Sequence, residues 1–226
     1  MEFGLVTEGI TDQIVLENIL YGFFNDKDLP IDPLSPLRDA TDEDKATTNS
    51  NWLEVFEYCK SSKFKEAVVI KDYVIVQIDT DVLRTNNVSK EYQMSFKHED
   101  GKEFSVEEIV EAVKNKLIET IGEEFYRQFQ AKIIFAISVH SIECWLLPIY
   151  FKTQKKKAGK IENCLNTLNE ALKKSKLFYI DNKEPKYYRA IAEKYKKNKI
   201  LMDSNKFNPS LKIFIEDLQS REISLE

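Results

Sequence analysis

Three short apolar runs have the composition of strands that are buried on both faces. They cover residues 3–7, 73–78 and 132–139. Such near-continuous runs of Val, Ile and Leu are typical of parallel sheets that carry helices on both sides. A helical pattern follows each run, so the chain can return and begin the next parallel strand. We therefore expect these runs to be neighbouring parallel strands of one α/β sheet.

Apolar residues at intervals of three and four predict the helices. These patterns lie at residues 10–20, 52–59, 105–121, 161–172, 187–192 and 209–218. Ser105 and Glu108 form the spacing of a capping box, Gly9 permits a tight turn after the first strand, and Thr11 or Asp12 can cap the first helix. Residues 144–147 before Pro148 predict a short helix or a tight connection.

Three further segments complete the expected fold. The β-branched run 67–70 predicts an additional strand, and 125–130 can extend the preceding helix beyond Gly122. Residues 26–51 are rich in Asp, Pro, Thr and Asn, and their prolines predict a long surface loop inserted near 25–51. We expect an α/β domain with a mainly parallel sheet at 1–150, and a helical C-terminal extension packed on it at 151–226.

Carboxylates follow all three predicted strands. Glu8 follows the first, Asp79 and Asp81 end the second, and Glu143 lies just beyond the third. Ligands of open α/β sheets bind outside the carboxyl ends of the strands. Carboxylates brought together there repel one another unless a divalent cation neutralises them, and an all-oxygen ligand set suits Mg²⁺ or Mn²⁺. The sequence therefore predicts a metal site able to recruit substrate phosphates.

Several of these residues have structural interpretations that remain open. Asp12 can be a helix cap and Asp81 a turn former, while His140 can pack or hydrogen-bond at a strand end. The run Lys155, Lys156 and Lys157 is either a solvated turn or a set of phosphate contacts. Only these Lys-rich segments after residue 152 offer an obvious basic surface.

Composition excludes some classes of protein. The 226 residues include 33 Lys and Arg against 38 Asp and Glu, a net charge of -5, which argues against a uniformly basic nucleic-acid wrapper. The cysteines, Cys59, Cys144 and Cys164, lack the spacing of a disulfide framework or a zinc site, so we expect reduced, buried thiols. Neither a membrane span nor a signal peptide is apparent, and we expect a cytoplasmic protein without membrane contacts.

The motif Leu5-Val6-Thr7-Glu8-Gly9-Ile10-Thr11-Asp12, followed by Val74-Ile75-Val76-Gln77-Ile78-Asp79-Thr80-Asp81, resembles the Toprim domain. Within that family the chain looks most like the small OLD-type nucleases, which are often anti-phage defence effectors, and Ser141-Ile142-Glu143-Cys144-Trp145-Leu146-Leu147 looks like their last acidic element. The resemblance implies that Glu8 is a metal ligand or general acid/base, that Asp79 and Asp81 are metal ligands, and that Asp12 and Glu143 hold a second metal.

The leading functional hypothesis is thus a Mg²⁺- or Mn²⁺-dependent nuclease acting on DNA or RNA, with a regulatory partner protein as a further expectation. One alternative takes Asp79-Thr80-Asp81-Val82 as the nucleophile motif of a haloacid-dehalogenase-type phosphatase, which leaves Glu8-Gly9 unexplained. Another is a non-catalytic binding or regulatory module that keeps the fold.

Overall fold

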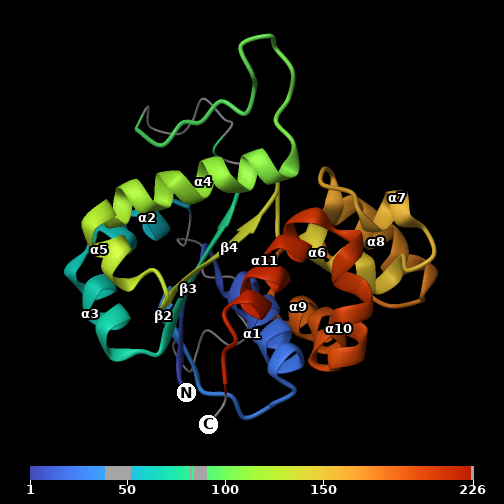
Figure 1. Cartoon of the computed structure of the whole chain (residues 1–226). Helices are drawn as coiled ribbons and strands as arrows, with labels where there is room; N and C mark the ends of the chain where they lie inside the picture. Colours follow the sequence, from blue (N-terminus) through green and yellow to red (C-terminus); the bar gives the residue numbers. More distant parts are fainter. Residues whose placement is uncertain (39–51, 82, 84–90, 225–226) are drawn as a thin grey trace.

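The computed structural model describes residues 1–38, 52–81, 83 and 91–224 of the chain. It shows an α/β fold with a four-stranded parallel sheet between helices and a helical C-terminal region (Figure 1). The strands are β1 (Phe3–Val6), β2 (Ile31–Ser35), β3 (Tyr73–Asp79) and β4 (Ile133–Ser138), in the order β2-β1-β3-β4. The expected fold class is confirmed.

The three predicted strands are parallel neighbours, as expected. Phe3 of β1 pairs with Tyr73 of β3, and Asp79 at the end of β3 pairs with Ser138 of β4. Alternate residues of β3 face two different hydrophobic cores: Ile75 faces one, and Val74 and Val76 face the other. Because the strands are parallel and in register, the chain segments that follow β1, β3 and β4 begin at the same edge of the sheet.

The expected long loop contains a fourth strand, so that expectation was wrong for residues 31–35. The strand β2 pairs with β1 at the edge of the sheet, where Gly4 is aligned with Asp32 and Leu5 with Pro33. An edge strand tolerates proline because one side of its backbone needs no ladder hydrogen bond. Residues 39–51 of the expected insertion lie outside the described part of the chain.

The β-branched run 67–70 is helical and not a strand. It ends α3 (Ser62–Ile70), which follows α2 (Trp52–Lys60) and begins with Ser61 accepting a hydrogen bond from the backbone N–H of Phe64. Val68 is buried while Val69 and Ile70 are exposed, the one-sided burial of a surface helix. Packing of this face against the sheet has overridden the strand preference of the β-branched side chains.

The first helix, α1 (Ile10–Phe24), is buried along most of its length. Its N-cap is Gly9, which makes no side-chain capping hydrogen bond, and Asp12 is the third residue of the helix. The expectation that Thr11 or Asp12 caps this helix was therefore wrong. With the capping role excluded, the position of Asp12 needs another explanation.

The helix α4 (Val106–Ile121) begins with the expected capping box, in which Ser105 and Glu108 bond reciprocally. It ends at Gly122, whose φ of 96° breaks the helix, so that α5 (Glu123–Phe129) is a separate element and not an extension. Together α2, α3 and α4 cover one face of the sheet (Figure 1).

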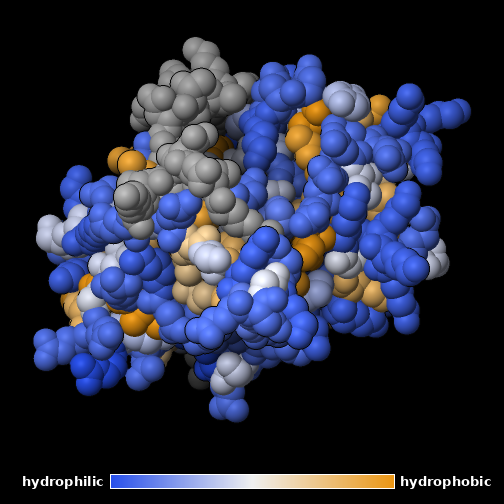
Figure 2. Space-filling model, turned by 90° about the horizontal axis from the view of Figure 1, so that it is seen from above, coloured by the Kyte–Doolittle hydropathy of each residue, from blue (hydrophilic) through white to orange (hydrophobic). Residues whose placement is uncertain are grey.

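The opposite face is covered by α1 and by the helices after β4. These helices are α6 (Glu143–Tyr150), α7 (Lys155–Ala158), α8 (Cys164–Lys174), α9 (Pro185–Ala192), α10 (Asn198–Ser204) and α11 (Pro209–Ser220), with 3₁₀ segments η2 (Glu193–Lys196) and η3 (Asn205–Phe207). Buried residues of α8 to α11 share one hydrophobic core with β1 and α1. Seen from above, the side that carries these helices presents a mainly hydrophilic surface (Figure 2).

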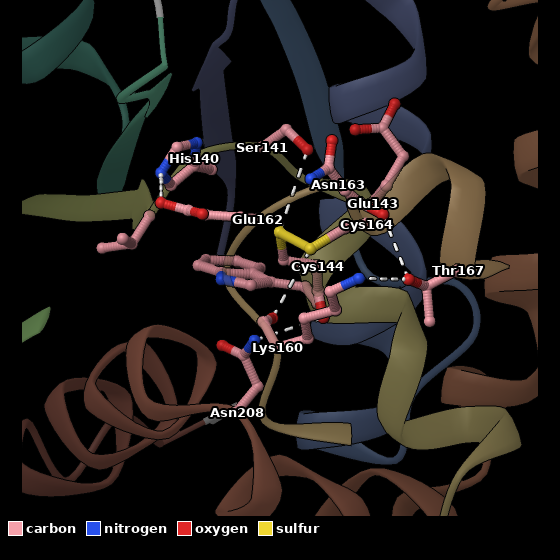
Figure 3. The surroundings of a disulfide bond; sticks show 12 residues. His140, Ser141, Glu143, Cys144, Lys160, Glu162, Asn163, Cys164, Thr167 and Asn208 are labelled. Atoms are coloured by element: carbon pink, nitrogen blue, oxygen red, sulfur yellow. Dashed lines mark hydrogen bonds and ion pairs between the residues drawn. A yellow bond between two sulfur atoms is a disulfide. The ribbon is translucent and has the colours of Figure 1, made fainter. Parts of the chain in front are cut away.

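Two of the three cysteines form a disulfide, which corrects the expectation of reduced thiols. Cys144 on α6 is bonded to Cys164 on α8, with their Cα atoms 5.0 Å apart (Figure 3). Cys59 is free and buried in the core on the other face of the sheet. The pairing depends on the packing of α6 against α8, which the spacing of cysteines along the chain does not encode.

No helix in the described part of the chain is long and apolar enough to cross a membrane.

Candidate functional site

The structure brings all five predicted metal ligands to the carboxyl edge of the sheet, four of them close together and Asp81 at the exposed rim. Glu8 follows β1, Asp79 ends β3, Glu143 begins α6 just after β4, and Asp12 lies in the first turn of α1. The charges of Glu8, Asp12 and Glu143 all raise the pKa of Asp79, and the charge of Asp12 also raises the pKa of Glu8. The convergence follows from the parallel order of β1, β3 and β4.

A buried glutamine aligns two of the carboxylates. The side-chain oxygen of Gln77 accepts a hydrogen bond from the backbone N–H of Glu8 at 3.3 Å, and its amide nitrogen donates to Asp79 Oδ1 at 2.9 Å. The backbone N–H of Asp79 in turn donates to Glu8 Oε1 at 2.6 Å. The sequence analysis did not predict a role for Gln77 at the site. The presence of one amide side chain in an otherwise apolar strand could have indicated such a role.

Burial and mutual repulsion raise the pKa values of three carboxyl groups. Burial, together with the charge of Asp12, raises the pKa of Glu8 to about 8. Burial also raises the pKa of Asp12 to about 7, with Lys183 opposing the shift and Glu143 adding to it. For Asp79, burial and the charges of Asp12 and Glu8 hold the pKa well above its ordinary value. The protonation of this cluster therefore changes near neutral pH.

Asp12 is only 5% exposed and lacks a full set of hydrogen bonds. The Thr11 hydroxyl donates to its Oδ2 at 3.5 Å, while Oδ1 is buried and has no hydrogen-bond partner among the described residues. A buried carboxylate oxygen without a partner costs free energy. This orphaned oxygen is the feature that a bound cation would satisfy.

Glu143 is the most deeply buried of the acids, with 1% of its side chain exposed. The Tyr188 hydroxyl donates to its Oε1 at 2.5 Å, and the ammonium nitrogen of Lys183 lies 3.1 Å from the same atom. Burial acts to raise the pKa of Glu143, but the charge of Lys183 and the hydrogen bonds outweigh it and hold that pKa below its ordinary value. Glu143 is thus ionised and paired in the fold.

Lys183 is the basic residue at this edge that sequence reasoning missed. Burial acts to lower its pKa, but the charges of Glu143, Asp79 and Asp12 outweigh burial and raise it above its ordinary value. Its ammonium group therefore supplies positive charge to these three carboxylates, and it also acts to lower the pKa of Glu8. The surrounding sequence Asp181-Asn182-Lys183-Glu184 is an ordinary polar turn, so no local signal marked it.

Asp81 lies at the exposed rim of the same edge. Its backbone N–H donates to the carbonyl oxygen of His140 at 3.1 Å, and its charge is one of the smaller causes of the raised pKa of Glu8. The Nε2 atom of His140 lies 3.3 Å from Glu162 (Figure 3), in line with the packing interpretation of this histidine. Cys144 follows Glu143 directly in sequence, so its disulfide with Cys164 lies beside Glu143. The carboxylate of Glu143 points away from the sulfur atoms (Figure 3).

The three lysines predicted to contact phosphate lie on the outer side of the helical region, on α7 (Figure 1). Lys155 and Lys156 are exposed, while Lys157 lies 3.5 Å from Glu170 and 5.2 Å from the ring centre of Phe151. These interactions belong to the surface of α7 and α8, and the structure does not bring the three lysines to the carboxylates.

The residue types at the edge suit a divalent cation, but their present arrangement does not form a ligand set. The acids offer only oxygen donors, and the orphaned Oδ1 of Asp12 fits a hard cation such as Mg²⁺ or Mn²⁺. Over residues 1–38, 52–81, 83 and 91–224, however, no three His, Cys, Asp or Glu side chains are grouped so that they could hold a metal ion. The ammonium group of Lys183 supplies the compensating charge in this arrangement.

No protein-family model, curated protein or solved structure shows a significant match to this chain.

Proposed function

We propose that this chain is a Mg²⁺- or Mn²⁺-dependent nuclease that hydrolyses phosphodiester bonds at the carboxyl edge of its sheet. The observation that carries the proposal is the electrostatic coupling of Glu8, Asp12 and Asp79, carboxylates from separate elements with raised pKa values. Proteins tolerate such clusters where a cation or a proton neutralises them. Shifted pKa values of this kind are concentrated at catalytic sites.

Each residue has a role that its environment supports. Asp12, Asp79 and Glu143 are the proposed cation ligands, and Asp81 at the rim is a fourth. A divalent ion held there would supply Lewis acidity toward the phosphate and would make a water molecule easier to deprotonate. Glu8, with a pKa of about 8, can accept or return a proton near neutral pH.

Lys183 has two proposed states. In the metal-free protein its ammonium group offsets the carboxylate charge. Because its side chain is 54% exposed, it can turn toward solvent when a divalent cation enters, and there its charge can attract the phosphate of a substrate. The proposed exchange explains how an edge that lacks a ready ligand set can still bind a cation.

The phosphatase alternative is less well supported. Its nucleophile would be Asp79, which must be ionised to attack, yet burial and three neighbouring carboxylate charges favour the protonated form. The binding-module alternative differs only in turnover, because an acidic cluster is necessary for this chemistry without being sufficient.

The cellular context is part of the proposal. The anti-phage role and the regulatory partner protein rest on the Toprim resemblance of the motifs. A cytoplasmic location fits a nucleic-acid substrate, whereas a lasting disulfide is typical of oxidising compartments. Cell fractionation would distinguish the two.

The test is incubation of the purified protein with plasmid, single-stranded DNA and RNA, each with Mg²⁺, Mn²⁺ or EDTA, beside an Asp79→Asn variant. We expect cleavage of at least one nucleic acid that requires the metal and is lost in the variant. Cleavage of a small phosphomonoester alone would support the phosphatase. Metal binding without cleavage of any substrate would support the non-catalytic module.

A further inference from the structure

The two chain segments that hold Asp12 and Lys183 continue side by side away from the acidic edge. Asp12 lies at the start of α1, and Lys183 lies two residues before α9. At the far end of α1, a Cβ atom on Gly22 would lie 1.8 Å from the carbonyl oxygen of Tyr195, and Asn198 donates to the carbonyl oxygen of Gly22 at 2.9 Å. Hence α1 runs in the same direction as the segment formed by α9 and η2. Both α1 and α9 begin near the acidic edge.

Two adjoining depressions follow this helix pair. The first, of about 580 Å³, lies between α1 and α9 and is lined by residues that include Ile14, Tyr21, Lys186 and Arg189. The second, of about 400 Å³, includes Lys27, Lys194 and Lys197. Both are lined by Ala190, Glu193 and Lys196, so they adjoin one another, and together they are here called the α1–α9 groove.

The α1–α9 groove is basic on a protein whose net charge is -5. Its described lining contains six basic side chains and two acidic ones. One of the acids, Glu17, lies 2.9 Å from the guanidinium of Arg38 and so is already paired. Burial and the neighbouring charge of Lys152 lower the pKa of Lys194, an environment in which a bound anion would be favourable. The groove thus favours an anionic ligand with charges spread along its length.

We propose that the α1–α9 groove binds the phosphodiester backbone of a nucleic-acid strand and leads it to the carboxylates. This inference rests on the nuclease function proposed above. From Asp12 to Tyr21 the helix rises about 14 Å, which corresponds to roughly four phosphates of one strand. The lysines of the groove and Arg189 pair with phosphates, and one of these lysines, Lys196, has its ammonium nitrogen 5.7 Å from the ring centre of Tyr21. A strand held in this way places a neighbouring phosphodiester at Asp12 and Lys183.

The test compares substitutions that change net charge equally. A groove variant carries Lys27→Gln, Lys194→Gln and Lys197→Gln, and a control variant carries Lys63→Gln, Lys173→Gln and Lys174→Gln at exposed positions elsewhere. Binding of a short fluorescent DNA or RNA strand is followed by anisotropy in EDTA. We expect at least about tenfold weaker binding by the groove variant alone, with the slope of log K against log salt reduced by about 2 for three lost phosphate contacts. Circular dichroism confirms that each variant is folded.

Three results would overturn the inference: unchanged binding by the groove variant, equal losses in both variants, or equal affinity for polyglutamate. A loss of binding on substituting Lys155, Lys156 and Lys157 instead would place the phosphate contacts on α7 and also overturn it. Because binding is measured in EDTA, the result does not depend on whether the chain cleaves the strand. If the groove variant binds more weakly but the wild type cleaves no nucleic acid, the groove inference is supported and the nuclease proposal is contradicted. If the wild type cleaves nucleic acid but the groove variant binds as well as the wild type, the nuclease proposal is supported and the groove inference is overturned.

Discussion

The ammonium nitrogen of Lys183 lies 3.1 Å from Oε1 of Glu143, and the two side chains differ greatly in exposure, at 54% and 1%. A buried carboxylate thus has a half-exposed cation as its partner. The same ammonium group acts on Asp79 and Asp12. This relationship makes Lys183 the balancing charge of the metal-free site and is the basis of the first prediction.

Replacing Lys183 with Met should destabilise the metal-free protein and increase its response to Mg²⁺. Removal of the charge leaves ionised Glu143 buried without its cation, which for a fully buried pair costs about 3 to 5 kcal/mol. Since Lys183 is half exposed, solvent screening reduces the expected loss to about 1 to 2 kcal/mol. Urea unfolding in EDTA measures this loss, and the rise in Tm on adding Mg²⁺ measures the second effect.

The matched control is Lys174→Met on the exposed surface of α8, for which a change within about 0.5 kcal/mol is expected. If Mg²⁺ raised the Tm of the Lys183 variant less than that of the wild type, Lys183 and the cation would not be alternatives at one site.

The raised pKa of Glu8 predicts a pH dependence of stability. Its ordinary value of 4.5 becomes about 8 in the fold, so between these values the folded state retains a proton that the unfolded state has released. Stability contributed by this group therefore falls as pH rises from about 4.5 to about 8. In Glu8→Gln, which keeps an oxygen to accept from Asp79 N–H, the fall should be smaller.

Urea unfolding of the metal-free proteins at about pH 5 and about pH 8 measures this difference. Glu124→Gln, an exposed substitution on α5, serves as the control and should follow the wild type. An identical pH dependence in the wild type and the Glu8 variant would contradict the raised pKa.

Asp12 and Ser105 allow a comparison of a site residue with a true helix cap. Asp12→Asn removes a charge from the cluster, so we expect metal-dependent activity to fall about a hundredfold or more, while the metal-free protein keeps its stability. Ser105→Ala removes the capping box of α4 and should cost about 1 kcal/mol with activity unchanged. Kinetic assays measure the activity of both variants, and urea unfolding measures their stability. Full activity in Asp12→Asn would remove Asp12 from the site.

The disulfide predicts a redox dependence of stability. Cys144 and Cys164 are 20 residues apart, and closing a loop of that size contributes about 3 kcal/mol in the chain-entropy description. A dithiol reductant should lower the Tm of the wild type and leave that of Cys164→Ala unchanged. Mass spectrometry after alkylation in denaturant should detect one labelled thiol, Cys59, before reduction and all three cysteines afterwards. Three labelled thiols before reduction would contradict the disulfide.

The strands and the acids that follow them were predictable because their signals are local. Residues 73–78 and 133–138 are apolar on both faces, and a parallel sheet between helices is the fold that buries such runs. Once the strands are parallel, Asp79 and Glu143 must reach the same edge. The capping box at Ser105 was equally visible, since both of its partners lie within one helical turn.

Local patterns did not predict the conformation of two segments, because each conformation depends on where the segment packs. Pro33 sits in a strand because that strand is at the edge of the sheet, and residues 67–70 are helical because one side of α3 is buried. In both segments, tertiary contacts override the local conformational preference of the residues.

The sequence by itself therefore determined the layered fold and which acids follow its parallel strands. Only the tertiary structure brought Tyr188 to Glu143 across 45 residues, joined Cys144 to Cys164, and placed Lys183 among the carboxylates. The physical reason is that hydrophobic periodicity specifies which face of an element is buried, whereas partners distant in sequence meet only when those faces pack together.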